Sequence, residues 1–258
     1  MTRVRVTLPL ALGALLVWLG LTVGVGWLTS AGRQQSLQAS VAGGIGPAWA
    51  LAALFALLLV LASGNRRAAG LGAPAPLKTL WLVWPPLLYA LLMLLLSWAG
   101  GWPPRDVLLV VAGNTALVAV SEELMFRAVL LQALLERFDM WPAVLLCAAL
   151  FGAAHAVNGL GTGDYGGALW QSAAAFLQGI CYAAIRLRTR SVWPMTVVHG
   201  LWDFALVTSI FTAAKEGDAS ILPYAALLAV LPLCLYGIFL LRPSRQALLH
   251  PQAGQPQR

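Results

Sequence analysis

Residues 107–135 read VLLVVAGNTALVAVSEELMFRAVLLQALL, and this stretch decides the fold class. It is longer than the about 20 apolar residues that a helix needs to cross a bilayer. Its central part nevertheless holds Glu122, Glu123 and Arg127. Ionisable side chains cost about 3 kcal/mol or more at the centre of a membrane helix, so they are rare there and mark functional sites. The stretch therefore predicts a membrane-spanning helix that carries chemistry.

Further apolar stretches lie on both sides of this one. The spans that we expect, with approximate boundaries, are 8–28, 47–63, 79–99, 107–135, 141–157, 168–185, 192–212 and 221–241. Composition agrees, because 60% of the 258 residues are hydrophobic and only 10% are charged, against about 25% charged in soluble domains. We see no alternating segments of the kind that builds membrane barrels. The sequence predicts an all-α, polytopic membrane bundle of about eight transmembrane helices.

The connections support a single membrane-embedded domain over residues 1–241. Residues 64–78 are expected to form a basic loop rich in Gly, Pro and Ala, and residues 100–106 contain Gly-Gly-Trp-Pro-Pro. Residues 158–167 are Gly-rich, and we expect no helix core in them. Residues 242–258 are rich in Pro and Gln, and we expect a disordered cytoplasmic tail. The apolar run from Leu8 to Leu28 exceeds the about 7–15 residues of a signal-peptide core, so we interpret it as the first span.

The distribution of basic residues predicts the orientation. With the N-terminus inside, the inner segments hold Arg3, Arg5, Arg66, Arg67, Lys78, Arg137, Arg186, Arg188, Arg190, Arg242, Arg245 and Arg258, and the outer loops hold Arg33, Arg105 and Lys215. Cytoplasmic loops carry the excess of Lys and Arg, so both termini are expected in the cytoplasm and the protein in the cell membrane. The net charge of +7 then indicates anionic lipid head groups and not nucleic acid.

The first motif is the sequence SEELMFR at residues 121–127. Glu123 and Arg127 are four residues apart with the acid first, the favourable order for a helical ion pair. Glu122 points about 100° away around an α-helix and shares that arginine less easily. An unpaired carboxylate in an apolar bundle is a candidate general base. The alternative is a buried ion-pair cluster that only holds helices together.

Two further motifs carry histidines. FGAAH ends at His155, and its small residues allow close helix packing. HGLWD places His199 and Asp203 on one helix face, where Asp203 could fix the His199 tautomer. Each histidine could instead have only a packing role. Helix rise spreads all these groups around the membrane midplane, which permits their convergence but does not require it.

The set EExxxR, FxxxH and HxxxD, in this order on successive apolar segments, resembles the CPBP family of type II CAAX prenyl endopeptidases and bacteriocin-processing relatives, also called Abi-type intramembrane proteases. The basic turn RLRTRSVWP at residues 186–194 fits as well, and the resemblance covers about residues 105–212. It implies an eight-helix glutamic endopeptidase that uses no metal and no cofactor. Its substrate would be a membrane-associated peptide or protein, either prenylated or a precursor.

The resemblance also implies roles for the motif residues. Glu122 would activate a water molecule, and His155 would help to hold or deprotonate that water. His199 and Asp203 would stabilise the oxyanion, with Glu123 and Arg127 in support. Eukaryotic members have Asn where this chain has Asp203. An ionised aspartate cannot donate a hydrogen bond, so Asp203 would have to be protonated or act by orienting His199.

Three other functions remain open from the residues. Two histidines and a glutamate also suit a zinc-dependent membrane hydrolase, although the sequence has no HExxH motif. A non-catalytic scaffold or bacteriocin-immunity-type protein is a second alternative, and a transporter with a proton relay is a third. The sequence has no GxSxG nucleophile motif, and Cys147, Cys181 and Cys234 have neither metal-ligand spacing nor the pattern of a disulfide framework.

Overall fold

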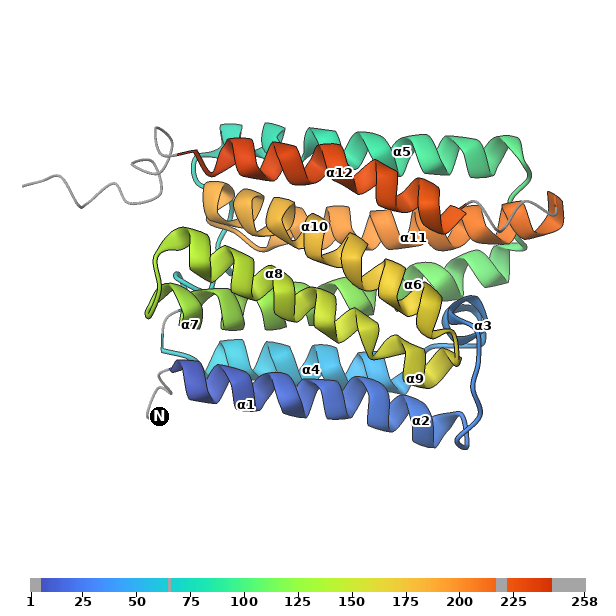
Figure 1. The fold of residues 1–258 in the computed structure, drawn as a ribbon, viewed down its shortest axis with the longest axis horizontal. Coiled ribbons are helices and arrows are strands. Elements are labelled where there is room, and N and C mark those ends of the chain that lie inside the picture. Colours follow the sequence, from blue (N-terminus) through green and yellow to red (C-terminus); the bar gives the residue numbers. More distant parts are fainter. Residues whose placement is uncertain (1–5, 65, 217–221, 243–258) are drawn as a thin grey trace, which may run out of the picture.

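The computed structural model describes residues 6–64, 66–216 and 222–242, except for the side chains of 213–216 and 222–228. These residues form a bundle of roughly antiparallel helices and no strand (Figure 1). Of the predicted tail 242–258, residues 243–258 lie outside the described residues, as do Arg3, Arg5, Arg245 and Arg258 of the charge count. The division into one domain and a tail stays a prediction.

The helices follow one another along the chain with short connections. Their bounds are α1 (Leu8–Leu19), the π-helix η1 (Gly20–Val25), α2 (Gly26–Thr29), α3 (Leu37–Ala42), α4 (Pro47–Ala62), the 3-10 helix η2 (Leu77–Val83), α5 (Trp84–Ala99), α6 (Arg105–Glu122), the π-helix η3 (Glu123–Leu130), α7 (Leu131–Leu135), α8 (Met140–Ala156), α9 (Asn158–Thr162), α10 (Tyr165–Thr189), α11 (Trp193–Glu216) and α12 (Leu222–Leu240). Several of these join end to end, so that α6, η3 and α7 make one long crossing.

The all-α membrane architecture is confirmed. Six helical stretches among the described residues are long and apolar enough to cross a membrane: Leu8–Thr29, Leu77–Ala99, Arg105–Leu135, Met140–Thr162, Tyr165–Thr189 and Trp193–Thr212. The two other expected spans coincide with shorter apolar helices, Pro47–Ala62 and Ala229–Leu240. The expected number of eight is therefore approximate, with six full-length crossings and two shorter helices at the predicted places.

The prediction that residues 158–167 contain no helix core was wrong. Helix α9 occupies the first half of this segment, and α10 begins at Tyr165. Gly163 has φ +75°, a left-handed conformation that ends α9. The Asp164 side chain then caps α10 by accepting a hydrogen bond from the Gly167 N–H at 2.8 Å. Capping and the helix break thus outweigh the weak helix propensity of glycine.

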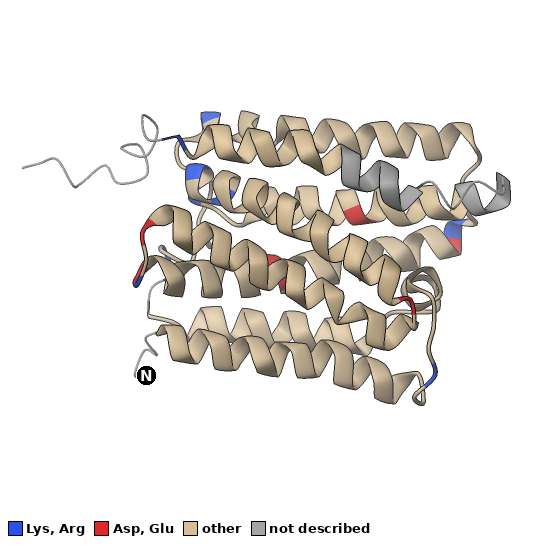
Figure 2. Cartoon of the chain, in the orientation of Figure 1, with Lys and Arg blue, Asp and Glu red and all other residues tan. Residues whose placement is uncertain are grey.

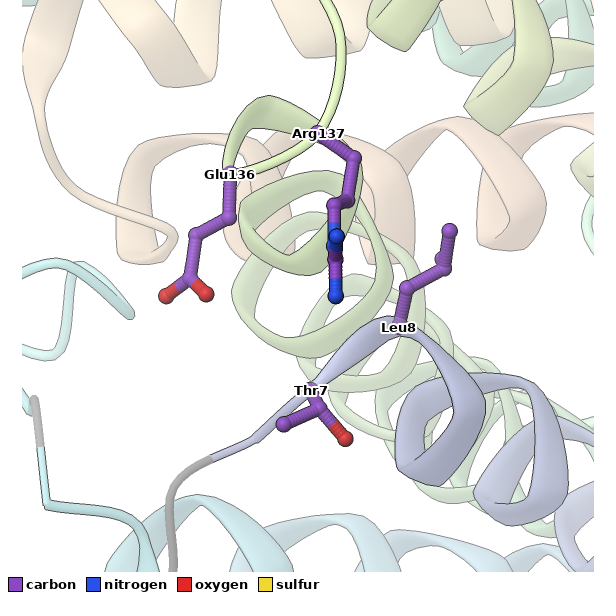
Figure 3. Close-up of a pocket in the computed structure, with 4 residues that line it drawn as sticks. All are labelled: Thr7, Leu8, Glu136 and Arg137. Carbon is purple, nitrogen blue, oxygen red and sulfur yellow. The ribbon is translucent and has the colours of Figure 1, made fainter.

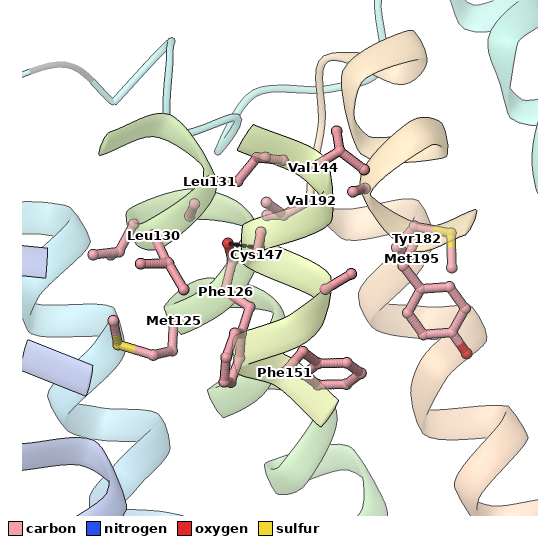
Figure 4. Packing of buried hydrophobic residues seen from close by; sticks show 14 of the residues in the cluster. Met125, Phe126, Leu130, Leu131, Val144, Cys147, Phe151, Tyr182, Val192 and Met195 are labelled. Carbon is pink, nitrogen blue, oxygen red and sulfur yellow. Dashed lines mark hydrogen bonds between the residues drawn. The ribbon is translucent and has the colours of Figure 1, made fainter. Parts of the chain in front are cut away.

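The buried centre of the bundle is formed by η3, α8, α10 and the first half of α11. Every residue of η3 is buried. Figure 4 shows the packing of this region, in which the rings of Phe126 and Phe151 meet edge to face at 4.9 Å. Leucines such as Leu16 and Leu96 are in contrast exposed on the outside. The bundle therefore keeps its charged motifs inside and turns aliphatic side chains outward, as a membrane requires.

One end of the bundle is basic and closely tied together. Lys and Arg gather at the end where α1 begins and α12 ends (Figure 2). There the segment 66–76 is hydrogen-bonded to the turn after α10: Ser191 Oγ donates to the Gly72 carbonyl at 2.7 Å, and Trp193 Nε1 donates to the Leu71 carbonyl at 2.8 Å. The buried Arg186 also donates to the Ala68 carbonyl. These bonds fix the start of α11, which carries the third motif.

Candidate functional site

The structure brings all six predicted site residues together in the middle of the bundle. Glu122 is the last residue of α6, and Glu123 and Arg127 lie in η3. His155 comes from the end of α8, while His199 and Asp203 come from α11. Figure 2 shows acidic positions about midway between the two ends of the ribbon, where α6 meets η3 and on α11. The convergence that the sequence only permitted is therefore present.

The first motif contains a change in helix type that the sequence did not reveal. The chain is α-helical as far as Glu122 and becomes a π-helix from Glu123 to Leu130. Short π-helical turns within α-helices are rare and occur frequently at functional sites. The Phe126 carbonyl in this turn accepts a hydrogen bond from the Cys147 thiol, at 3.3 Å (Figure 4). The wider turn changes the angle between the side chains before and after it.

The predicted pairing of Glu123 with Arg127 is present. Arg127 Nη1 lies 3.5 Å from Glu123 Oε1. The same carboxylate oxygen accepts a hydrogen bond from His199 Nδ1 at 2.9 Å. All three side chains are buried. Glu123 therefore joins the first and third motifs, and its negative charge faces two basic groups.

Arg127 is held by aromatic rings as well as by its ion pair. Its guanidinium carbon lies 4.1 Å from the centre of the Phe151 ring, 5.5 Å from that of Tyr182 and 5.9 Å from that of Phe126. A desolvated cation–π contact contributes about 2 kcal/mol. Within the described residues the three guanidinium nitrogens make no hydrogen bond. The rings therefore supply much of the stabilisation of this buried cation.

Glu122 points elsewhere and has different neighbours. Its Oε2 atom is buried and has no hydrogen-bond partner among the described residues. The closest basic atoms to this oxygen are Nε2 of His199 at 3.6 Å and Nε2 of His155 at 4.0 Å. These distances exceed those of direct hydrogen bonds. One carboxylate oxygen and two imidazole nitrogens therefore face one another across a short gap.

The remaining hydrogen bonds of the two histidines fix their orientation. His155 Nδ1 lies 2.9 Å from the Phe151 carbonyl oxygen, which can only accept, so this nitrogen carries the hydrogen. His199 Nδ1 likewise donates to Glu123. In the neutral form of either ring, the lone pair is then on Nε2, the atom that faces Glu122.

Asp203 is the most open member of the site. Its side chain is 27% exposed, and its Oδ2 atom lies 3.4 Å from His199 Nε2. The predicted placement of His199 and Asp203 on one helix face is therefore confirmed. The tautomer is held differently from our expectation, because Glu123 binds Nδ1 of His199 and Asp203 lies beside the opposite nitrogen.

Sequence reasoning missed Tyr182 and Gln178, one turn apart on α10. The Tyr182 ring lies 5.2 Å from the His199 ring, and its hydroxyl accepts a hydrogen bond from Gln178 Nε2 at 2.5 Å. Both residues lie in an apolar run without a motif, so no local pattern distinguishes them from packing residues.

Two other features of the described residues lie outside this arrangement. No group of three or more His, Cys, Asp or Glu side chains there is arranged to hold a metal ion, and the three cysteines are free and buried. A cavity of about 310 Å³ lies at the basic end, lined by Thr7, Leu8, Glu136 and Arg137 (Figure 3). None of the predicted site residues lines this cavity.

The chain was compared with protein families, curated proteins and solved structures. Residues 104–205 match the family described as type II CAAX prenyl endopeptidase, Rce1-like. The matched range runs from the start of α6 into α11 and includes all six predicted site residues. No curated protein and no solved structure matches the chain.

Proposed function

We propose that the chain cleaves peptide bonds with a water molecule activated by Glu122 and His155, as a member of the Rce1-like family of type II CAAX prenyl endopeptidases that residues 104–205 match. The family match supports a protease that acts within the lipid bilayer, and the long apolar helices support a multi-pass membrane protein. The mechanism, the roles of the residues and the kind of substrate are our proposals.

The proposed mechanism rests on the surroundings of Glu122 Oε2. This buried oxygen has no hydrogen bond among the described residues, and it faces Nε2 of His155 and of His199 at 4.0 and 3.6 Å. A single water can bridge polar atoms that lie further apart than a direct hydrogen bond allows. A water that donates to Glu122 and to the His155 lone pair would be oriented for attack on a carbonyl carbon.

The hydrolysis then proceeds in two steps. Glu122 takes a proton from the water while the water oxygen bonds to the carbonyl carbon, which leaves a negative charge on the carbonyl oxygen. His199, as an imidazolium between Glu123 and Asp203, donates from Nε2 to that oxyanion. When the carbon–nitrogen bond breaks, the proton on Glu122 passes to the leaving amine. One water is consumed, and one carboxyl group and one amine are formed.

Glu123 and Arg127 support the reacting groups without touching the substrate. Glu123 holds the Nδ1 proton of His199, and Arg127 balances the charge of Glu123. Asp203 orients the other side of the His199 ring at 3.4 Å. A precisely held hydrogen-bond donor is worth more at a developing charge than a mobile one, because no reorganisation is needed during the reaction.

We further propose that the substrate is a membrane-associated peptide, either prenylated or a precursor, and that the protein lies in the cell membrane with both termini in the cytoplasm. The site's position in the middle of an apolar bundle supports a substrate that partitions into lipid. The basic end of the bundle supports the orientation (Figure 2).

The test is hydrolysis of a quenched-fluorescent farnesylated peptide by the purified protein in detergent, with and without a chelator. We expect cleavage that resists the chelator, and a loss of about 10²–10⁴-fold in kcat for Glu122→Gln, as for removal of a general base. Glu136→Gln is the matched control, because this carboxylate is exposed at the end of α7. It should cleave like the wild type.

Other outcomes would assign the protein differently. Cleavage that stops with chelator and returns with zinc would identify a zinc-dependent hydrolase. If the wild type cleaves neither this peptide nor any protein in membranes of its host, and Glu122→Gln leaves the cellular phenotype intact, the protein is a scaffold or immunity-type protein.

A further inference from the structure

Tyr182 is a buried tyrosine that belongs to none of the three motifs and yet contacts two of them. Its ring lies 5.2 Å from the His199 ring at an angle of 58°. The same ring receives the Arg127 guanidinium at 5.5 Å. The residue is completely buried. A phenol is a costly choice at such a position, because a buried hydroxyl must find hydrogen-bond partners.

The hydroxyl of Tyr182 accepts one hydrogen bond, and its own hydrogen remains available to donate another. Gln178 Nε2 donates to the hydroxyl oxygen at 2.5 Å, which orients the phenol. The hydroxyl can donate one further hydrogen bond, and among the described residues no acceptor for it is found. Figure 4 shows the hydroxyl pointing away from the Phe126 and Phe151 rings.

The depth of this hydroxyl matches that of the third motif. Helices α10 and α11 are antiparallel and joined by a short turn at the basic end. Tyr182 precedes the end of α10 by about as many residues as His199 follows the start of α11, so the two lie at a similar depth. The phenol reaches toward Gln178, one turn further in, which is the level of Asp203. A peptide carbonyl that reaches His199 must enter this same interior space.

The chemistry of the site calls for such a donor. Oxyanion stabilisation in amide hydrolysis usually uses more than one hydrogen-bond donor. His199 Nε2 can supply one, but an ionised Asp203 supplies none because a carboxylate only accepts. A neutral phenol donates without adding a charge to the bundle.

We propose that Tyr182, oriented by Gln178, donates a hydrogen bond to the oxyanion of the tetrahedral intermediate. Tyr182 is then a catalytic residue, and Gln178 is a positioning residue. Asp203 orients His199 and is not the second donor. This assignment rests on the proposed function, since it needs a peptide bond to be hydrolysed at Glu122.

The test compares Tyr182→Phe with Tyr236→Phe in the farnesylated-peptide assay. Tyr182→Phe keeps the ring contacts with His199 and Arg127 and removes only the hydroxyl. Tyr236→Phe is matched, because its hydroxyl also donates inside the bundle, to the Leu82 carbonyl at 3.2 Å, away from the site. Loss of one oxyanion donor lowers kcat by about 10²–10³-fold. We expect this loss for Tyr182→Phe with KM little changed, and wild-type kcat for Tyr236→Phe.

Gln178→Leu provides a second variant that leaves the tyrosine in place. It should lower kcat, by less than Tyr182→Phe does, and it should have little further effect in the Tyr182→Phe background because the two act as one unit. The midpoint of thermal unfolding of each variant in detergent, compared with that of the wild type, tests whether the bundle is intact.

The outcomes separate the two proposals. Wild-type kcat in Tyr182→Phe overturns the role of Tyr182, while loss of cleavage in Glu122→Gln still supports the protease mechanism. Equal losses in Tyr182→Phe and Tyr236→Phe also overturn it, because they would reflect the removal of any buried hydroxyl. If the wild type cleaves nothing, the proposed function fails and this assignment fails with it. If Tyr182→Phe does not fold, an unchanged kcat in Gln178→Leu would refute it.

Discussion

Substitution of Arg127 should leave the buried negative charge of Glu123 without its ion-pair partner and destabilise the protein. A second substitution, Glu123→Gln, should restore part of the lost stability. Arg127→Met takes away the permanently charged group that lies 3.5 Å from Glu123, a carboxylate with no solvent exposure. Breaking a buried ion pair by removing one partner costs about 3–5 kcal/mol, because the remaining charge is uncompensated. We therefore expect the free energy of unfolding to fall by that amount.

Glu123→Gln in the same chain should restore part of this loss. The amide is neutral, and its oxygen can still accept the hydrogen bond that Glu123 Oε1 takes from His199 Nδ1 at 2.9 Å. What remains is mainly the lost contact of the guanidinium with the rings of Phe151, Tyr182 and Phe126, about 1–2 kcal/mol. The double variant should thus be more stable than Arg127→Met alone by about 2–3 kcal/mol.

Unfolding of the purified protein in detergent micelles, titrated with a denaturing detergent and followed by circular dichroism, measures these differences. Arg137→Met is the matched control, since this arginine is exposed at the end of α7. It should change the stability by less than about 0.5 kcal/mol. The reasoning is refuted if Glu123→Gln lowers the stability of the Arg127→Met variant further, or if Arg127→Met costs no more than the control.

Two other predictions concern helix packing and the role of Asp203. In Gly237→Ala the new Cβ would lie 2.7 Å from Cys181 Cα and 2.9 Å from its backbone nitrogen, so α10 and α12 must separate, at a cost of about 1–3 kcal/mol. Gly13→Ala, with nothing within 4 Å, should be neutral or stabilise by up to about 1 kcal/mol; equal unfolding midpoints for the two variants would contradict the close approach. Asp203→Asn should lower kcat by less than about tenfold, because an amide oxygen can replace one orienting contact worth about 1 kcal/mol. Loss of peptide cleavage as complete as in Glu122→Gln would mean that the reaction needs a negative charge at this position.

The helices and the pairs within them could be predicted because both depend on neighbours in the sequence. Apolar runs of about 20 residues placed the crossings, and the four-residue spacing placed Glu123 beside Arg127 and His199 beside Asp203. These contacts depend on helix geometry alone. The fold class and the two pairs Glu123–Arg127 and His199–Asp203 can therefore be predicted from the sequence.

The rest of the site depends on contacts between segments that are distant in the sequence. The meeting of Glu122 with His155 and His199 follows from helix tilt and from the π-helix that begins at Glu123, neither of which has a signature in the residues. The first span also contacts the site, because Trp18 Nε1 donates a hydrogen bond at 2.9 Å to Oγ of Ser121, the residue before Glu122. That span has no motif, so its sequence shows only that it is apolar.

The two histidines differ in which part of the chain sets their protonation geometry. The Nδ1 proton of His155 is bound by the Phe151 carbonyl of its own helix, so it moves with α8 as one rigid unit. The Nδ1 proton of His199 is bound by Glu123 of another helix. A substrate that enters the bundle, or a thinner bilayer, could move α11 slightly away from η3. This movement would break the hydrogen bond from His199 Nδ1 to Glu123 and leave the one from His155 Nδ1 to the Phe151 carbonyl in place. Lateral strain in the membrane should therefore act on the tautomer of His199 and not on that of His155.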